Sequence, residues 1–99
     1  MDIDIQYIRI SSSESLNQFV IKKLMKIAKK YAWLIKGQVT FSFENKQKRT
    51  GNTCEILLSL PGPRIFAKST ETNFEKAAAQ TVSDLEIQLK KRKQQFQDY

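Results

Sequence analysis

The sequence predicts an α+β fold, a two-layer β-α-β-β-β-α sandwich in which two helices pack on one face of a four-stranded sheet. Two observations predict it: four stretches alternate apolar and polar residues with period two, and two longer stretches repeat apolar residues at helical spacing. A sheet and two amphipathic helices bury their apolar sides most simply as two layers. A third observation is length, because 99 residues can bury only one core, so residues 1–99 are expected to form a single domain.

The first strand is predicted over Asp2–Ile10, where isoleucine and tyrosine alternate with polar residues. Its alternation shifts phase at Ile8, which indicates a β-bulge. Ser11 and Glu14 fit a capping box, in which the hydroxyl and the carboxylate each satisfy a backbone N–H of the first helical turn. The helix that follows is expected to run to about Tyr31. Its predicted buried stripe consists of Leu16, Val20, Leu24, Ile27 and Tyr31.

The next three strands are predicted over residues 35–44, Cys54–Leu60 and Ile65–Ser69. Their side chains expected to face the core include Val39, Phe41, Phe43, Ile56, Leu58 and Leu60. A polar loop over Glu44–Asn52 separates the first two of these strands. Pro61-Gly62-Pro63 predicts a tight reversal between the last two, because proline fixes φ and glycine permits positive φ.

A long second helix is predicted from a capping box at Thr72 and Glu75 to the C-terminus. Its packed face is expected to consist of Phe74, Ala77, Ala78, Thr81, Val82, Leu85 and Leu89. Phe19 and Ile87 project off the apolar arcs of their helices. Each is either a contact residue or one of the exposed apolar side chains that every protein carries.

The charge balance favours a polyanionic partner. Seventeen Lys and Arg against ten Asp and Glu give a formal net charge of +7 and a pI near 9.7. Each phosphate that a cation neutralises releases condensed counterions, which drives binding. The net charge alone is compatible with binding to nucleic acid, with binding to an anionic membrane, and with a role in solubility only. The positions of the charges along the chain are needed to distinguish these interpretations.

The first helix concentrates its cations on one side. Between Leu16 and Lys36 the chain has no acidic residue. At about 100° per residue, five lysines lie in an arc of roughly 120° beside the apolar stripe: Lys22, Lys23, Lys26, Lys29 and Lys30. A helix surface that is merely solvated usually mixes signs, because Glu–Lys pairs four apart stabilise it and like charges repel.

The second helix carries a further basic cluster, with one more lysine on its outward face. The residues are Lys90, Lys91, Arg92 and Lys93 in the cluster, and Lys76 on the outward face. Basic residues near a helix C-terminus also favour the macrodipole, and such a run is often only a solvated tail. Because both basic segments lie on helices expected to pack side by side, we favour binding of nucleic acid.

Several other classes of function are excluded or disfavoured. The chain has no histidine and one cysteine, so it has no histidine base, no histidine-containing triad and no zinc knot. Cys54 is interpreted as a small packing residue. We expect no enzyme activity, no cofactor, no metal and no small-molecule substrate. No apolar run reaches the roughly 18 residues of a membrane span, and Asp2 and Asp4 stand where a secretory signal would have basic residues, so a cytoplasmic location is expected.

The chain resembles the ribosome hibernation factors, the short hibernation-promoting factor and ribosome-associated inhibitor group, also known as sigma-54 modulation proteins. The stretches that carry the resemblance are Asp2–Tyr31 with Lys-Leu-Met-Lys-Ile at 23–27, Glu55–Gly62, Ile65–Ser69, Phe74–Ala77 and residues 85–91. Two features depart from the family. Many members have histidine where this chain has Tyr7–Ile10, and Ala79 stands where an acidic residue is common.

The resemblance implies a fold similar to double-stranded-RNA-binding domains. It also implies binding to the 30S subunit and the 70S ribosome through 16S rRNA, where the protein occupies the messenger and tRNA sites and silences translation in slow growth. The expected contacts are the basic residues of the two helices named above, with Arg9 and Arg64 as weaker candidates. Phosphate contacts of this kind position a protein, and shape supplies the selectivity.

Two alternatives stay open at this point: a double-stranded-RNA-binding module for other RNAs, and a protein-interaction domain that regulates, for example, a transcription factor. The protein is expected to be a monomer off the ribosome. Longer members of the family carry a second domain that pairs ribosomes, and we expect no counterpart of it in these residues.

Overall fold

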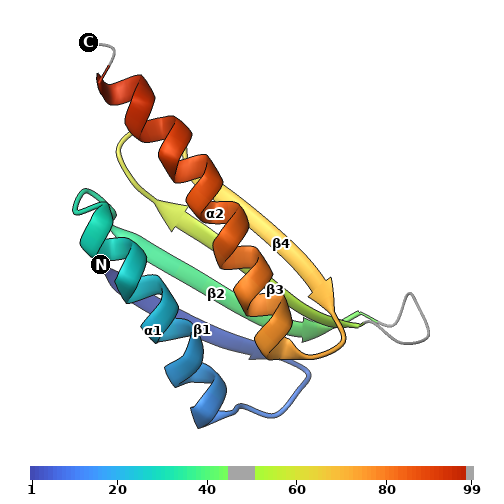
Figure 1. Ribbon diagram of the computed structural model, residues 1–99. Coiled ribbons are helices and arrows are strands. Elements are labelled where there is room, and N and C mark those ends of the chain that lie inside the picture. The colour runs from blue at the N-terminus through green and yellow to red at the C-terminus, as the bar shows by residue number, and fades with distance from the viewer. Residues whose placement is uncertain (45–50, 98–99) are drawn as a thin grey trace.

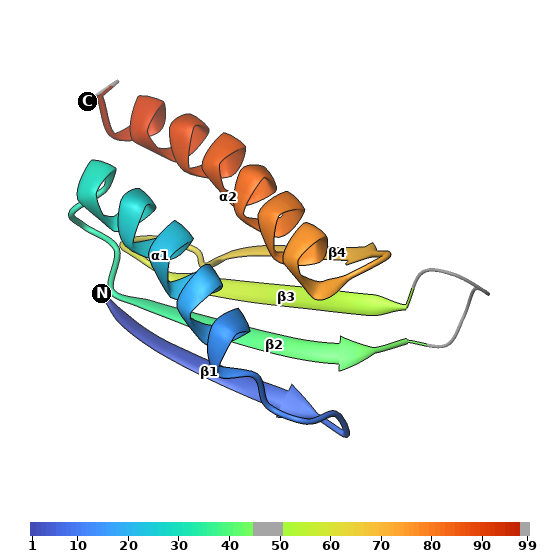
Figure 2. The ribbon, with the colours of Figure 1, turned by 60° about the horizontal axis from the view of Figure 1, so that its bottom comes forward.

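The strands form one mixed sheet in the order β1-β2-β3-β4, with both helices on the same face (Figures 1 and 2). The computed structural model describes residues 1–44 and 51–97. The elements are β1 (Asp2–Ile8), α1 (Glu14–Lys30), β2 (Lys36–Phe43), β3 (Asn52–Ser59), β4 (Ile65–Glu71) and α2 (Phe74–Gln97). The predicted fold class and element order are therefore confirmed.

Connectivity explains the mixed pairing. α1 returns the chain from the end of β1 to the start of β2, so these two strands are parallel, with Asp4 opposite Gln38. β2 pairs antiparallel with β3, and β3 pairs antiparallel with β4. Gly62, with φ 91°, lies in the predicted Pro-Gly-Pro turn between β3 and β4.

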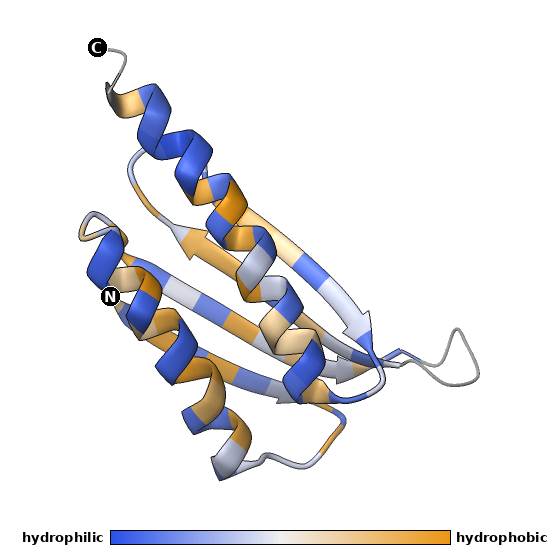
Figure 3. Ribbon diagram, viewed as in Figure 1, coloured by the Kyte–Doolittle hydropathy of each residue, from blue (hydrophilic) through white to orange (hydrophobic). Residues whose placement is uncertain are grey.

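The core lies between the sheet and the helices, and the hydropathy colouring of the ribbon shows hydrophobic residues in both layers (Figure 3). The predicted stripe of α1 is buried, and so are the predicted packed residues of α2 except Phe74, which is half-buried against the core. The buried Thr81 hydroxyl lies 2.8 Å from the carbonyl oxygen of Ala77 and 3.1 Å from that of Cys54. A truncation such as Leu24→Ala would cost about 2–5 kcal/mol of stability, because a cavity would remain in this core.

The C-terminal end of the first strand and the N-terminal caps of both helices differ from the predictions. β1 ends at Ile8, and its pairing with β2 runs without a bulge, because Arg9 adopts φ 58° and turns the chain. Both predicted capping boxes are wrong. The residue directly before α1 is Ser13, whose hydroxyl oxygen accepts the backbone N–H of Leu16 at 3.2 Å. The residue directly before α2 is Asn73, whose side-chain oxygen accepts the backbone N–H of Lys76 at 2.8 Å.

The far end of β2 contains the other differences. Phe43 continues the inward side of the alternation, yet it is 54% exposed, because its ring lies over Gly51 at the end of the strand. A Cβ on Gly51 would come within 2.6 Å of that ring and 2.7 Å of the backbone oxygen of Glu44, so any other residue would force the ring and the backbone to shift. The predicted loop over Glu44–Asn52 lies largely outside the described residues, and Asn52 belongs to β3.

Candidate nucleic-acid interface

The five predicted lysines of α1 lie on one flank of the helix, beside its buried stripe. Burial of the stripe from Leu16 to Ile27 fixes the rotation of the helix. Four of the lysines are exposed: Lys22, Lys26, Lys29 and Lys30. Lys23 is half-buried because its ammonium lies 5.1 Å from the centre of the Phe19 ring, a cation–π contact. Phe19 itself packs against the core.

A groove separates the C-terminal end of α1 from the facing side of α2. It encloses about 590 Å³ and is lined by Lys30, Tyr31, Ser83, Glu86, Ile87, Lys90, Lys93 and Gln94. The two predicted basic segments therefore come together at this groove: α1 contributes Lys30, and α2 contributes Lys90 and Lys93. Lys30 also forms an ion pair with Glu86 across the groove, at 3.5 Å.

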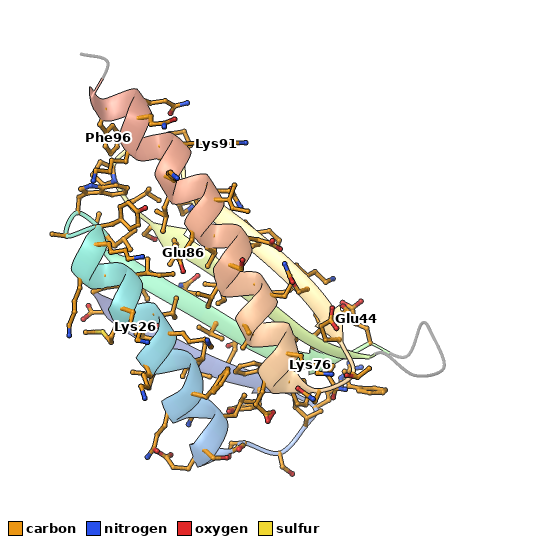
Figure 4. The ribbon with its side chains drawn as sticks, viewed as in Figure 1. Lys26, Glu44, Lys76, Glu86, Lys91 and Phe96 are labelled. Atoms are coloured by element: carbon orange, nitrogen blue, oxygen red, sulfur yellow. The ribbon has the colours of Figure 1, made fainter. Side chains whose placement is uncertain are left out.

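The remaining cations of α2 do not line this groove. Lys76 stands in the first turn of α2, about 25 Å along the helix from Lys93 at 1.5 Å per residue, beside Glu71 and Gln80. Lys91 points away from α1 (Figure 4). Arg92 is half-buried and donates an N–H to the carbonyl oxygen of Pro61 at 3.1 Å. The four residues of the predicted cluster at 90–93 therefore do not form one surface. Lys90 and Lys93 face the groove, Lys91 points away from α1 (Figure 4), and Arg92 reaches the turn after β3.

The two weaker candidates are placed apart from the groove. Arg9 follows the end of β1, and Arg64 precedes β4 in the turn after β3. Both side chains are exposed. Whether any of the predicted cations contacts RNA stays a prediction.

Charge pairing differs between the helices and the open face of the sheet, the face that carries no helix. Within residues 1–44 and 51–97, Lys30 is the only predicted contact residue in an ion pair. On the open face, Lys36 pairs with Asp4 at 2.9 Å. Lys68 pairs with Glu44 at 2.6 Å and with Glu55 at 3.5 Å. The hydrogen bond to Glu44 raises the pKa of Lys68. Among residues 1–44 and 51–97, most of the lysines without an ion pair therefore lie on the helix layer.

Three aromatic rings contact one another next to the groove, beginning with Tyr31, which lines it. Tyr31 meets Trp33 edge-on at 5.5 Å between ring centres, and Trp33 meets Phe96 at 5.1 Å. Sequence reasoning missed Glu86 and Phe96 as neighbours of the basic residues. Their spacing in the sequence could have indicated this, because residues four or seven apart lie on the same face of a helix: Glu86 precedes Lys90 by four residues, and Phe96 follows Leu89 by seven.

Cys54 is fully buried, as expected for a packing residue, and burial raises the pKa of its thiol to about 12. In the part of the chain that the structure describes, no group of three or more Cys, Asp or Glu side chains is placed to hold a metal ion. Neither helix, over its described residues, is both long and apolar enough to cross a membrane.

The family model described as "Sigma 54 modulation protein / S30EA ribosomal protein" matches residues 3–97. A ribosomal subunit interface protein from Coxiella burnetii has a similar structure, with a TM-score of 0.83 and 24% identity over 94% of this chain and 98% of that one. The N-terminal domain of Thermus thermophilus Protein Y gives a TM-score of 0.78 and 22% identity, over 92% and 98%. No curated protein matches. At these identities the two structures support the fold, while the family model covers nearly all of the sequence. The chain therefore belongs to the sigma-54 modulation protein / S30EA ribosomal protein family.

Proposed function

We propose that this protein is a cytoplasmic ribosome hibernation factor. It binds the small ribosomal subunit near the messenger and tRNA sites and inhibits translation in slow growth. The observation that carries the proposal is the acid-free lysine arc of α1 beside the groove lysines of α2, in a chain of this family. The named structural relative from Coxiella burnetii, a ribosomal subunit interface protein, adds support.

The proposed mechanism is steric and electrostatic. Exposed lysines on α1 and α2 release counterions from rRNA phosphates and so hold the protein in place. The rigid two-layer body then occupies space that messenger and tRNA need. No bond is made or broken, so the proposed role requires neither a catalytic residue nor a cofactor.

Sedimentation through a sucrose gradient at about physiological salt tests this proposal. We expect the protein to move with 30S subunits and 70S ribosomes. A protein that stays at the top of the gradient, away from both particles, would rule out the ribosome as its target.

Charge reversal identifies the binding surface. The variant Lys26→Glu/Lys30→Glu/Lys90→Glu/Lys91→Glu should lose about a hundredfold or more in affinity for 30S, with a shallower salt dependence, because each lost phosphate contact lowers the slope by about 0.9. All four side chains are exposed, so the fold should persist. An unchanged salt slope would instead favour a protein partner.

A blunt RNA duplex provides the comparison for the main alternative. A ribosome-binding protein should prefer 30S strongly over a plain duplex, since shape provides its selectivity. Equal affinity for the two would favour a general double-stranded-RNA-binding module.

A further inference from the structure

The groove between α1 and α2 contains more than cations. Three lysines line it, namely Lys30, Lys90 and Lys93. Ile87 lines the same groove and is 56% exposed. An exposed isoleucine is ordinary on a protein surface, but this one stands in a hollow among positive charges. The groove therefore offers an apolar surface within reach of anion-binding groups.

Polar groups complete the lining. Ser83 and Gln94 lie on α2 one to two turns from Ile87, and both can donate and accept hydrogen bonds. Glu86 adds an acceptor, held across the groove by Lys30 at 3.5 Å. Figure 4 shows Glu86 on the side of α2 that faces α1. The groove is open to solvent, and its volume of about 590 Å³ leaves room for one nucleotide.

These features together match a ligand with a phosphate, a flat apolar surface and hydrogen-bonding edges. The backbone of an RNA duplex offers the phosphates but keeps its bases stacked inside. An unpaired nucleotide exposes its base face and its edges as well. Protein sites for such nucleotides place cations near the backbone, and sites for extruded bases stack the base against aromatic or apolar side chains.

We propose that this groove binds a single unpaired nucleotide of the rRNA, with the phosphate on its lysines and the base on Ile87. The proposal rests on the proposed ribosome-binding function. It adds that binding depends on an unpaired residue at one position as well as on phosphates. Glu86, Ser83 and Gln94 face the base edge and determine which base is preferred.

Two RNAs with the same number of phosphates test the proposal: a duplex with one bulged nucleotide, 2-aminopurine, and a blunt duplex with the same base pairs that carries one 5′-phosphate to match the count. We expect the protein to bind the bulged RNA about fivefold more tightly, which is at the low end of what a base gains from stacking on an aromatic ring, because isoleucine is a smaller platform. The fluorescence of 2-aminopurine should change on binding. Equal affinity for both RNAs would overturn the proposal.

A matched pair of variants locates the effect. Ile87→Ser should remove the preference for the bulge, because it removes the apolar platform while leaving the lysines in place. Ile35→Ser is the control: its side chain is 59% exposed and is not part of the groove. A preference that survives Ile87→Ser would also overturn the proposal.

The same pair is then compared for binding to 30S subunits. We expect Ile87→Ser to bind about fivefold more weakly than Ile35→Ser, by loss of the same base contact. Equal binding of the two variants would overturn the nucleotide site and leave the proposed function intact. Failure of the unmodified protein to bind 30S would instead overturn the proposed function.

Discussion

The helix layer and the open face of the sheet both carry lysines, but the lysines differ in whether they contact an acidic side chain. On the sheet, Lys36 and Lys68 each contact a carboxylate. On α1, four of the five lysines in the arc form no ion pair with any described residue. In the described part of the chain, lysines without an acidic partner are therefore more frequent on the helices than on the open face of the sheet.

The difference follows from local geometry. Glu55 lies directly opposite Lys68 on the neighbouring strand, where unlike charges stabilise a sheet. The lysines of α1 are three and four residues apart, so they repel one another and gain nothing from their own helix. Such repulsion is offset only when a polyanion binds. The number of cations on a surface thus says less about binding than whether they are paired.

Neutralising matched pairs of lysines should produce the largest difference between the two surfaces. Lys90→Gln/Lys93→Gln and Lys36→Gln/Lys68→Gln each remove two positive charges. We expect the first pair to weaken 30S binding about tenfold, because two phosphate contacts are lost. The second pair should change binding less than twofold. Binding curves at several salt concentrations measure both, and equal losses would remove the distinction between the surfaces.

Removing the one acid that faces the groove should have a smaller and opposite effect. Glu86→Gln frees Lys30 from its ion pair. We expect about a threefold gain in affinity for 30S, since surface ion pairs of this kind are worth only about 0.2–1 kcal/mol. Asp84→Asn, on the same helix, is the control with an equal change of charge. A gain that is the same for both would show a general charge effect.

Arg92 should behave as a structural residue of the helix layer, with the smallest effect on binding. Arg92→Gln removes its hydrogen bond to Pro61, and we expect about 0.5–1 kcal/mol of lost stability in urea unfolding. Lys91→Gln, whose side chain is exposed, should leave the free energy of unfolding unchanged. Equal stability of the two variants would mean that the contact to the β3–β4 turn contributes nothing.

The fold was predictable from the sequence wherever periodicity dominates. The buried stripe of α1 and the packed face of α2 follow from helical spacing, and both are confirmed. The helix starts were missed because several adjacent residues can cap. Ser11 and Ser13 carry the same hydroxyl, and only the turn at Arg9 decides between them.

The candidate site was only partly predictable. The lysine arc of α1 is a property of one helix, so its sequence determines it. The meeting of Lys30 with Lys90 and Lys93, and the reach of Arg92 to Pro61, depend on how α2 packs against α1 and the sheet. That packing joins residues about 30 or more positions apart, which no local pattern specifies.

Directed cleavage of rRNA tests most directly whether the helix layer is the surface that faces the ribosome. Gln18→Cys on α1 and Gln38→Cys on the open sheet face replace two exposed glutamines. Each can carry an iron chelate that generates hydroxyl radicals. Cys54 should not react, since it is buried and its pKa is raised to about 12. On 30S subunits we predict strong cleavage of 16S rRNA from position 18 and weak cleavage from position 38. Stronger cleavage from position 38 would contradict the account.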